Sequence, residues 1–295
     1  MIPRGNPLIS SYIATTETQR GQILAIVNQK GGVGKTTTAV NLTASLAAAE
    51  RATLLVDIDP QANASSAFGV IAPELHLYDA LMGDCVMLEA ARPTELSHLH
   101  LVPSGPDLVG AEIELVTMED RECRLRRVLE PVACAYDYIV IDCPPSLGLL
   151  TVNALTAADA VIIPMQCEYY ALEGLARLLD TIERIRRGLN PRLEVKGIGL
   201  TMMDRRANLC RQVEGEVRKH FGDRVFATAI PRNVRLSEAP SHGKPILLYD
   251  LHSKGAKSYL GLAEELLRRG GEDHSPRKPP LLPIPREGEE DDGGR

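Results

Sequence analysis

Seven short aliphatic runs separated by helix-length segments constrain the fold of this chain more than any other feature. The runs are ILAIVN (23–28), TLLVDI (53–58), LHLVP (99–103), YIVID (138–142), AVIIP (160–164), VKGIGLTM (195–202) and RVFATAI (224–230). Runs that are apolar almost throughout indicate strands covered on both faces. The segments between them, such as 37–50 and 172–188, predict right-handed β-α-β crossovers. We therefore expect an α/β fold with a doubly wound, mostly parallel sheet flanked by helices, and ligands beyond the carboxyl ends of its strands.

The 295 residues have room for one large α/β domain. We expect this single domain to occupy residues 21–269. A polar, aperiodic arm precedes it at 1–20, and a tail rich in proline, glycine and acidic residues follows it at 270–295. Both terminal segments are predicted to be disordered.

Cysteine spacing and hydropathy indicate the cellular compartment of the protein. The six cysteines form no Cys-x-x-Cys pair, so we interpret them as reduced thiols in a cytoplasmic protein. No stretch approaches the roughly 18 consecutive apolar residues of a membrane span, and the N-terminus lacks an apolar signal-peptide run. We therefore expect no membrane partner.

The strongest chemical signal follows the first apolar run. Residues 29–37 read Gln-Lys-Gly-Gly-Val-Gly-Lys-Thr-Thr and lead directly into an alanine-rich helix. A glycine-rich turn that opens a helix directs backbone N–H groups and the helix N-terminus at an anion. Lys35 would reach the β- and γ-phosphates of a nucleotide, and the Thr36 hydroxyl would bind Mg²⁺. The predicted cofactor-binding residues of this loop are Lys30, Gly31, Gly32, Val33, Gly34, Lys35, Thr36 and Thr37.

Three aspartates end strands downstream of this loop. Asp57 and Asp59 end the second apolar run, and Asp142 ends the run at 138–142. A carboxylate at the tip of a buried strand is costly unless a cation or hydrogen bonds compensate it. Mg²⁺ is the expected cation for Asp142, in the Walker B role of a nucleoside triphosphatase.

The loop departs from the general phosphate-loop pattern because Gln29 stands where that pattern has glycine, and an additional lysine, Lys30, follows it. This is the deviant Walker A motif. Together with VDIDPQ (56–61) and DCPPSLG (142–148), it resembles the ParA/Soj family of partitioning ATPases, from Gly21 to about Arg269.

That resemblance implies an ATPase in which ATP and Mg²⁺ bring two copies together face to face as a homodimer. Lys30 would reach the phosphates of the other copy, Asp59 would orient the attacking water, and Asp57 would support Mg²⁺ without touching it. The segment of the family that contacts adenine matches Pro231 and Asn233. Ordinary turn chemistry also explains these two residues, so both interpretations stay open here.

Net charge excludes a globally basic nucleic-acid coat but permits a local basic face. The whole chain carries a net charge of −6, whereas residues 177–235 contain 14 Lys/Arg and seven Asp/Glu. A basic surface favours non-specific binding of double-stranded DNA. The resemblance points to Arg206 and Arg235 for this role, although each could also be a surface or helix-cap arginine. It also implies a ParB-like partner that stimulates slow ATP hydrolysis, and a nucleoid-associated location in chromosome or plasmid segregation.

Three alternatives share parts of this pattern. A ParA-like ATPase could position another cellular cargo. A membrane-cycling relative of the MinD type would need a basic amphipathic C-terminal helix, which the acidic, proline-containing tail does not offer. An iron–sulfur protein would need paired cysteines, and Cys143 beside Asp142 has no second cysteine at a recognisable spacing.

Overall fold

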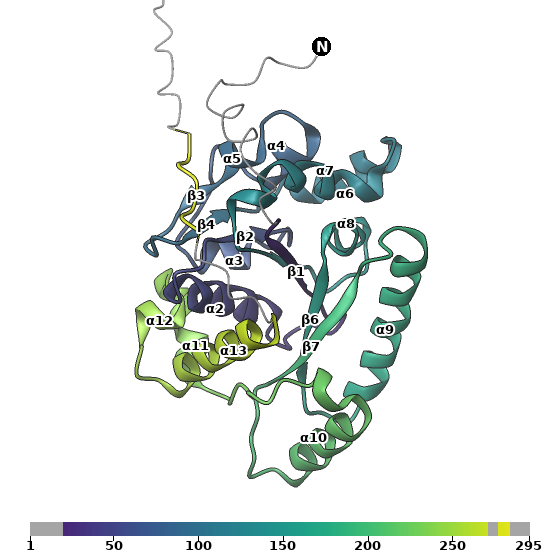
Figure 1. Ribbon diagram of the computed structural model, residues 1–295, viewed down its shortest axis with the longest axis vertical. Coiled ribbons are helices and arrows are strands. Elements are labelled where there is room, and N and C mark those ends of the chain that lie inside the picture. The colour runs from purple at the N-terminus through teal and green to yellow at the C-terminus, as the bar shows by residue number, and fades with distance from the viewer. Residues whose placement is uncertain (1–19, 271–276, 284–295) are drawn as a thin grey trace, which may run out of the picture.

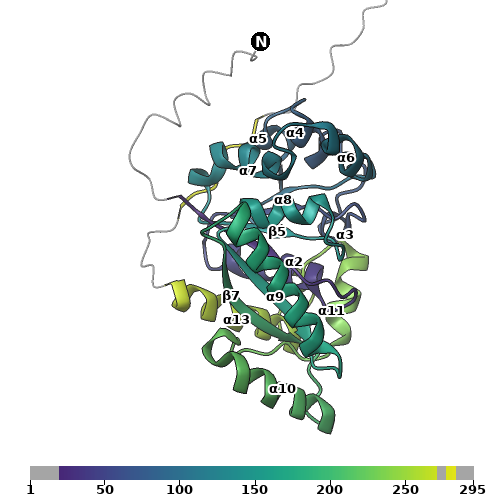
Figure 2. The same ribbon diagram turned by 90° about the vertical axis from the view of Figure 1, so that its right-hand side faces the viewer.

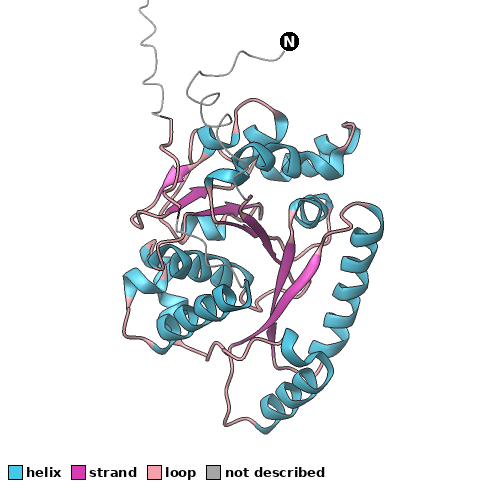
Figure 3. Ribbon diagram, in the orientation of Figure 1, coloured by secondary structure: helices cyan, strands magenta, loops and turns pink. Residues whose placement is uncertain are grey.

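The computed structural model describes residues 20–270 and 277–283. Residues 1–19 of the expected arm, and residues 271–276 and 284–295 of the expected tail, lie outside the described residues. One central sheet carries helices on both of its faces, which gives three layers (Figures 1 and 3).

The sheet has the mostly parallel topology that the sequence predicts. Its strands are β1 (Gln22–Ile26), β2 (Thr53–Asp57), β3 (Arg92–Pro93), β4 (Leu99–Val102), β5 (Tyr138–Asp142), β6 (Ala160–Gln166) and β7 (Glu194–Thr201). They lie in the order β3-β4-β2-β5-β1-β6-β7. Every neighbouring pair is parallel except β3 with β4. The α/β fold class is confirmed.

The helices divide between the two faces of the sheet. They are α2 (Lys35–Ala48), α3 (Asn63–Ser66), α4 (Leu77–Met82), α5 (Met87–Ala90), α6 (Leu108–Glu114), α7 (Arg124–Leu129), α8 (Leu149–Ala157), α9 (Ala171–Gly188), α10 (Asn208–Phe221), α11 (Val234–Glu238), α12 (Ile246–Tyr249) and α13 (Lys254–Gly270). Helices α2 and α13 pack together on one face. On the other face, α8 and α9 cover the sheet (Figure 2).

Successive side chains along each strand point to opposite faces of the sheet and enter two different hydrophobic cores. In β1, Ile23 and Ala25 enter the core beneath α8 and α9, whereas Leu24 and Ile26 enter the core beneath α2 and α13. All four side chains are fully buried. Both faces of a strand are thus covered, which explains why the strands read as continuous apolar runs.

The prediction of a strand at 224–230 is wrong. This stretch makes one isolated parallel bridge, Ile198 with Val225, and Pro231 just beyond it makes another with Met203. Between its contacts with β7, side chains from the neighbouring helices bind its backbone. Glu265 accepts hydrogen bonds from the backbone N–H groups of Ala227 and Thr228 at 2.7 and 2.8 Å. Because those N–H groups are already bonded, they cannot donate to a strand ladder.

A short strand that the apolar pattern does not indicate, β3, borders the sheet. Arg92 pairs with Leu101 and Pro93 with His100, antiparallel to β4. Pro93 lacks a backbone N–H, which suits the edge position. The apolar pattern also does not predict the short 3₁₀ helices. Two of them are η1 (Leu115–Thr117), which follows α6, and η4 (Gly222–Arg224), which follows α10.

Part of the expected C-terminal tail lies against the domain. The Arg277 guanidinium donates to the backbone carbonyl of Tyr136 at 2.6 Å and pairs with Asp137 at 3.4 Å. Pro280 is buried, and Leu282 packs against the core beneath α8 and α9. The division of the chain into arm, domain and tail stays a prediction. Among the described helices, none is both long and apolar enough to cross a membrane.

Candidate functional site

The chemistry-bearing residues gather at the carboxyl ends of three neighbouring strands. Strand β5 lies between β2 and β1, and its Asp142 stands in register with Asp57 of β2 and Ile26 of β1. The phosphate loop, residues 27–34, follows β1 directly and leads into α2. The parallel sheet therefore brings the loop and the predicted acidic residues to one edge.

Backbone conformation shapes the loop around open space. Gly32 and Gly34 have φ of +73° and +87°, in the left-handed region that favours glycine. A Cβ added at Gly32 would meet nothing within 4 Å, so its glycine is required by conformation and not by crowding. The Thr201 hydroxyl donates to the carbonyl of Val33 at 2.8 Å and ties the loop to β7. The loop is thus held open at the N-terminus of α2, where anions bind.

Lys35 is the first residue of α2 and is 7% exposed. Its Nζ donates to the backbone carbonyl of Lys30 at 3.1 Å, inside the loop. Burial lowers the pKa of Lys35, and the nearby carboxylates of Asp142 and Asp59 oppose that shift. A phosphate in the loop would accept a charge-assisted hydrogen bond from this buried ammonium.

Asp142 is fully buried, and neither of its carboxylate oxygens accepts a hydrogen bond of ordinary geometry. Burial, followed by the charge of Asp57, raises its pKa; the Thr36 hydroxyl lies close enough to lower it in part. A buried carboxylate without partners is destabilising unless a cation joins it. Mg²⁺ prefers oxygen ligands and keeps waters and phosphate oxygens in its shell. Asp142 and Thr36 therefore fit a Mg²⁺ ion at the phosphate loop.

Asp57 differs because both of its oxygens are already used. One accepts from the backbone N–H and the hydroxyl of Ser65 at 2.8 and 2.7 Å. The other accepts from the backbone N–H of Asp59 at 3.2 Å. Burial raises the pKa of Asp57 to about 6 despite these bonds. This bonding fits a residue that supports the site, as the sequence predicts, and not one that binds a metal directly.

The segment that carries Asp59 is fixed from two sides. Its own carboxylate accepts from the backbone N–H of Gln61 at 3.0 Å, and its carbonyl accepts from the Ser104 hydroxyl at 2.7 Å. The backbone N–H of Ser104 donates to the Ser65 hydroxyl at 2.9 Å. Sequence reasoning missed both serines. Ser65 was detectable in ANASS, directly after the acidic motif, whereas Ser104 joins the network only through folding.

Lys30 points away from the centre of its own loop. Its side chain is 51% exposed and forms an ion pair with Glu168, in the turn between β6 and α9. Glu168 was not singled out from the sequence, although QCEYY (166–170) is part of the family resemblance. Lys35 alone of these two lysines is therefore buried at the loop in the free protomer.

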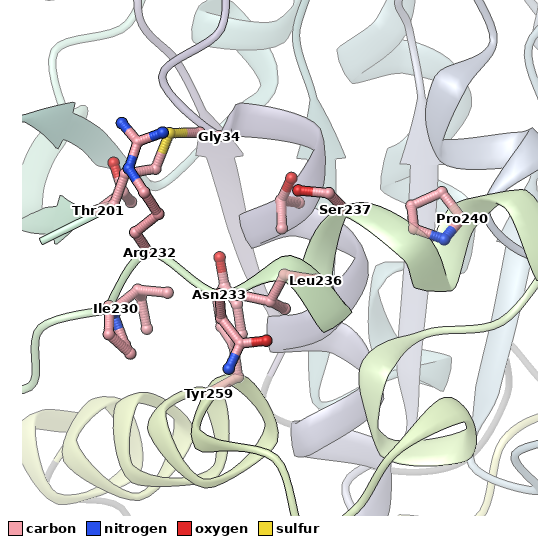
Figure 4. Close-up of a pocket in the computed structure, with 12 residues that line it drawn as sticks. Gly34, Thr201, Ile230, Arg232, Asn233, Leu236, Ser237, Pro240 and Tyr259 are labelled. Carbon is pink, nitrogen blue, oxygen red and sulfur yellow. The ribbon is translucent and has the colours of Figure 1, made fainter.

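A pocket of about 190 Å³ opens beside the loop. Figure 4 shows side chains from the end of β7, from the segment before α11, from α11 and from α13 around it. Its lining includes both predicted adenine-contacting residues, Pro231 and Asn233, together with Gly34 and Thr37. The Asn233 side chain also accepts from the backbone N–H of Arg235 at 2.9 Å and caps α11. Asn233 therefore both caps a helix and lines the pocket, so the two interpretations of this residue are compatible.

The two predicted DNA-contacting arginines lie on segments that border this pocket. Arg206 follows β7 and is 92% exposed at its side chain, where it pairs with Asp204 at 3.0 Å. The bond with Arg206 lowers the pKa of Asp204. Arg235 lies inside α11 and pairs with Glu238 at 2.9 Å. The two segments touch, because the backbone N–H of Met203 donates to the carbonyl of Ile230 at 2.9 Å.

Cys143, the residue that could have suggested an iron–sulfur site, is fully buried. Its burial raises the pKa of the thiol. All six cysteines lie within the described residues, and none of them forms a disulfide bond. The position fits a small core residue in the turn after Asp142.

A phosphate loop after β1 and an acidic residue at the tip of β5 define a P-loop ATPase of the deviant Walker A class. The model of the AAA domain family matches residues 21–195. The chain is 60% identical over 251 residues to the chromosome partitioning protein ParA of Myxococcus xanthus, covering 84% of this chain and 89% of the relative. It is 56% identical to the sporulation initiation inhibitor protein Soj of Bacillus subtilis, covering 85% of this chain and 100% of the relative. The chain belongs to the ParA/Soj family.

Solved structures share the fold. The cobyrinic acid a,c-diamide synthase of Mycobacterium smegmatis, solved with ADP and magnesium, has a TM-score of 0.75 at 35% identity and covers 89% of this chain and 100% of its own. The septum site-determining protein MinD of Pyrococcus horikoshii, solved with Mg-ADP, has a TM-score of 0.72 at 27% identity, covering 85% and 98%. These neighbours agree with the expected cofactors, ATP and Mg²⁺.

Proposed function

We propose that this protein is a chromosome-segregating ATPase whose ATP-bound homodimer binds DNA without sequence preference and is released by hydrolysis. One observation carries the proposal furthest. Asp142 is a buried carboxylate without a hydrogen-bond partner, in a site that also holds Thr36 and Lys35. Mg²⁺ with ATP supplies the charge that this arrangement lacks.

Each residue has a distinct part in this chemistry. Lys35 binds the β- and γ-phosphates together with the loop N–H groups, and it holds charge that grows on the γ-phosphate during transfer. Thr36 and Asp142 hold Mg²⁺, which neutralises phosphate charge when bound. Asp59 is 6% exposed at the same edge of the sheet, where its carboxylate can orient the attacking water. Asp57 fixes the backbone that carries Asp59.

ATP assembles the dimer through Lys30. Among the described residues, the half-exposed ammonium pairs with Glu168 alone, at the surface. Such surface pairs contribute about 0–1 kcal/mol. Release from that pair is therefore inexpensive, and the triphosphate of a second copy offers a stronger anion. A copy without ATP presents no such anion, so dimerisation depends on nucleotide.

DNA binding follows from the basic window at 177–235 and its position. Arg184 and Arg187 of α9 lie in exposed surface pairs that DNA phosphates can replace. Arg211 and Lys219 of α10 are exposed as well.

Met202 lines the pocket and lies four residues before Arg206 in the chain. Asn233 and Leu236, which flank Arg235 in the sequence, line it as well. Nucleotide in the pocket therefore contacts both arginine-bearing segments, which links ATP to the DNA surface.

A ParB-like protein is the expected partner, and it stimulates slow hydrolysis. The M. xanthus relative and a relative from Caulobacter vibrioides are both named chromosome partitioning proteins, which favours a chromosome over another cargo. A cytoplasmic, nucleoid-associated location is part of this proposal. A gene for a ParB-like protein beside the gene for this chain would support the assignment directly.

DNA binding measured with ATP, with ADP and without nucleotide, each at two salt concentrations, tests this proposal. We expect binding to random-sequence duplex DNA with ATP only, and a steep loss of affinity at the higher salt concentration. Equal affinity in all three nucleotide states would contradict the proposed switch.

A further inference from the structure

Helix α6 and the 3₁₀ turn η1 present an apolar strip to solvent. Val109, Ile113 and Val116 are 56%, 73% and 53% exposed, and their spacing places them on one side of the helix. We call these three residues the α6 strip. The opposite side of the same segment is buried, since Leu108, Ala111 and Leu115 are fully covered by the core. A helix that is apolar on both sides is one that a second surface covers.

Acidic residues surround the α6 strip. Residues 107–122 contain six Asp/Glu and one Arg, which gives this segment a net charge of −5. Asp107, Glu114, Glu119 and Asp120 are exposed. An apolar strip with an acidic border matches a partner that combines apolar side chains with positive charge.

Size and symmetry argue against a second copy of this chain as the occupant. Three aliphatic side chains fall far short of the roughly 800 Å² that each partner buries in a standard interface between folded proteins. A two-fold contact through this strip would also place two acidic borders against each other. A short segment, such as one amphipathic helix, fits the size of the strip better.

The strip lies on an element that contacts the turn beyond Asp142. Glu112 belongs to α6, and a Cβ added at Gly148 would lie 2.2 Å from its Oε1. That oxygen is buried and has no hydrogen-bond partner. Gly148 caps α8 and ends the 142–148 motif. A partner bound on α6 would therefore press on an element in direct contact with this turn, which follows the predicted magnesium ligand.

We infer that the α6 strip docks a basic, amphipathic segment of the partner protein that stimulates hydrolysis. This inference rests on the proposed function and adds the surface on which that partner docks. A second copy of this chain is an outcome that the test separates from it.

The test uses the full chain with ATP, and the fluorescently labelled full-length ParB-like protein of the same genome as the probe. Ile113→Glu places a charge in the centre of the strip, and Glu119→Lys reverses one charge of its border. Ile71→Glu is the matched control, because Ile71 is an aliphatic side chain, 84% exposed, outside the strip. Fluorescence anisotropy gives the affinity, while light scattering and ATP turnover without partner report the integrity of each variant.

We expect Ile113→Glu to lower partner affinity at least about tenfold. Glu119→Lys should lower it less, with a weaker salt dependence, and Ile71→Glu should leave it unchanged. Basal turnover and ATP-dependent dimerisation should match the wild type in all three variants. The inference would be overturned if Ile113→Glu bound the partner with wild-type affinity. It would also be overturned if the partner bound neither the wild-type chain nor any variant.

Loss of dimerisation in Ile113→Glu would also overturn the inference, because it would assign the strip to the contact between copies. A failure of the proposed function gives a different pattern. In that case DNA binding by the wild type would not depend on ATP. Ile113→Glu would still bind the partner more weakly than Ile71→Glu does.

Discussion

Lys30 and Glu168 form an ion pair between the phosphate loop and the turn before α9, and both side chains are about half exposed. The pair holds the additional lysine of the loop outside the space that Lys35 occupies. The two lysines, five residues apart, therefore lie in different environments: one is buried at the loop and the other is available to a second molecule.

Lys30→Gln should separate nucleotide binding from assembly. We expect ATP affinity to stay within a few-fold of the wild type, because the Lys30 side chain pairs with Glu168 and only its backbone carbonyl contacts Lys35 inside the loop. ATP-dependent dimerisation and hydrolysis should both be lost. Titration with a fluorescent ATP analogue and light scattering measure the two properties. Glu173→Gln, which removes a similar exposed ion pair with Arg177, is the control and should dimerise normally.

Lys35→Ala should abolish nucleotide binding or hydrolysis. A charge-assisted hydrogen bond to a phosphate contributes about 1.5–3 kcal/mol, so ATP affinity should fall by about 10- to 150-fold. Isothermal titration calorimetry measures this change. ATP affinity and turnover equal to those of the wild type would remove Lys35 from the phosphate site.

Asp142→Asn should stabilise the nucleotide-free protein while abolishing hydrolysis. The substitution removes a buried carboxylate that repels Asp57 and whose oxygens accept no hydrogen bond of ordinary geometry. We therefore expect the free energy of unfolding to rise by about 1–2 kcal/mol. Denaturant unfolding without ATP and Mg²⁺ tests this, and turnover with both tests the functional loss. A variant less stable than the wild type would show that another group already compensates Asp142.

His100 should make folding stability fall in mild acid. Its side chain is buried and contacts the Tyr136 hydroxyl at 2.9 Å, and burial lowers its pKa from 6.5 to about 4. The unfolded chain therefore takes up a proton first as the pH drops below about 6.5, and stability is lost between there and pH 4. The shift corresponds to about 3 kcal/mol.

His100→Gln should flatten this pH dependence, and His252→Gln, at an exposed position, should not. Unfolding free energies at pH 7, 6 and 5 make the comparison. Because Asp57 and Asp142 have raised pKa values, they oppose His100 in this range. The difference between the two variants, and not the wild-type curve alone, isolates the histidine.

Most of the architecture was predictable from the sequence, for a physical reason. A parallel sheet covered on both faces requires aliphatic residues at consecutive positions, and six of the seven apolar runs became strands. The seventh, at 224–230, is equally apolar. Glu265 overrode that pattern by binding the backbone of Ala227 and Thr228 from α13. Such a contact spans nearly forty residues, and no local pattern carries it.

The candidate site was predictable where one motif contains its own chemistry. The phosphate loop, Asp57 and Asp142 each follow a strand, so their meeting follows from the parallel sheet. Glu168 and Ser104 were not predictable in the same way, because their roles depend on contacts with Lys30 and with the Asp59 segment. The pocket, likewise, exists only because the segment of Pro231 folds back beside Thr37.

Arg235→Glu should weaken DNA binding equally for all sequences and leave basal ATP turnover intact. Loss of one phosphate contact should also reduce the slope of log affinity against log salt by about 1. Anisotropy with two unrelated duplexes at several salt concentrations measures both effects. A loss confined to one duplex would instead indicate base recognition.

The mass in solution of the hydrolysis-deficient Asp59→Ala protein with ATP and Mg²⁺ tests the central claim most directly. We predict a dimer with ATP, a monomer with ADP, and a monomer with ATP when Lys30→Gln is added to the same chain. A monomer in the ATP-loaded Asp59→Ala protein, under conditions where bound ATP is confirmed, would contradict the account.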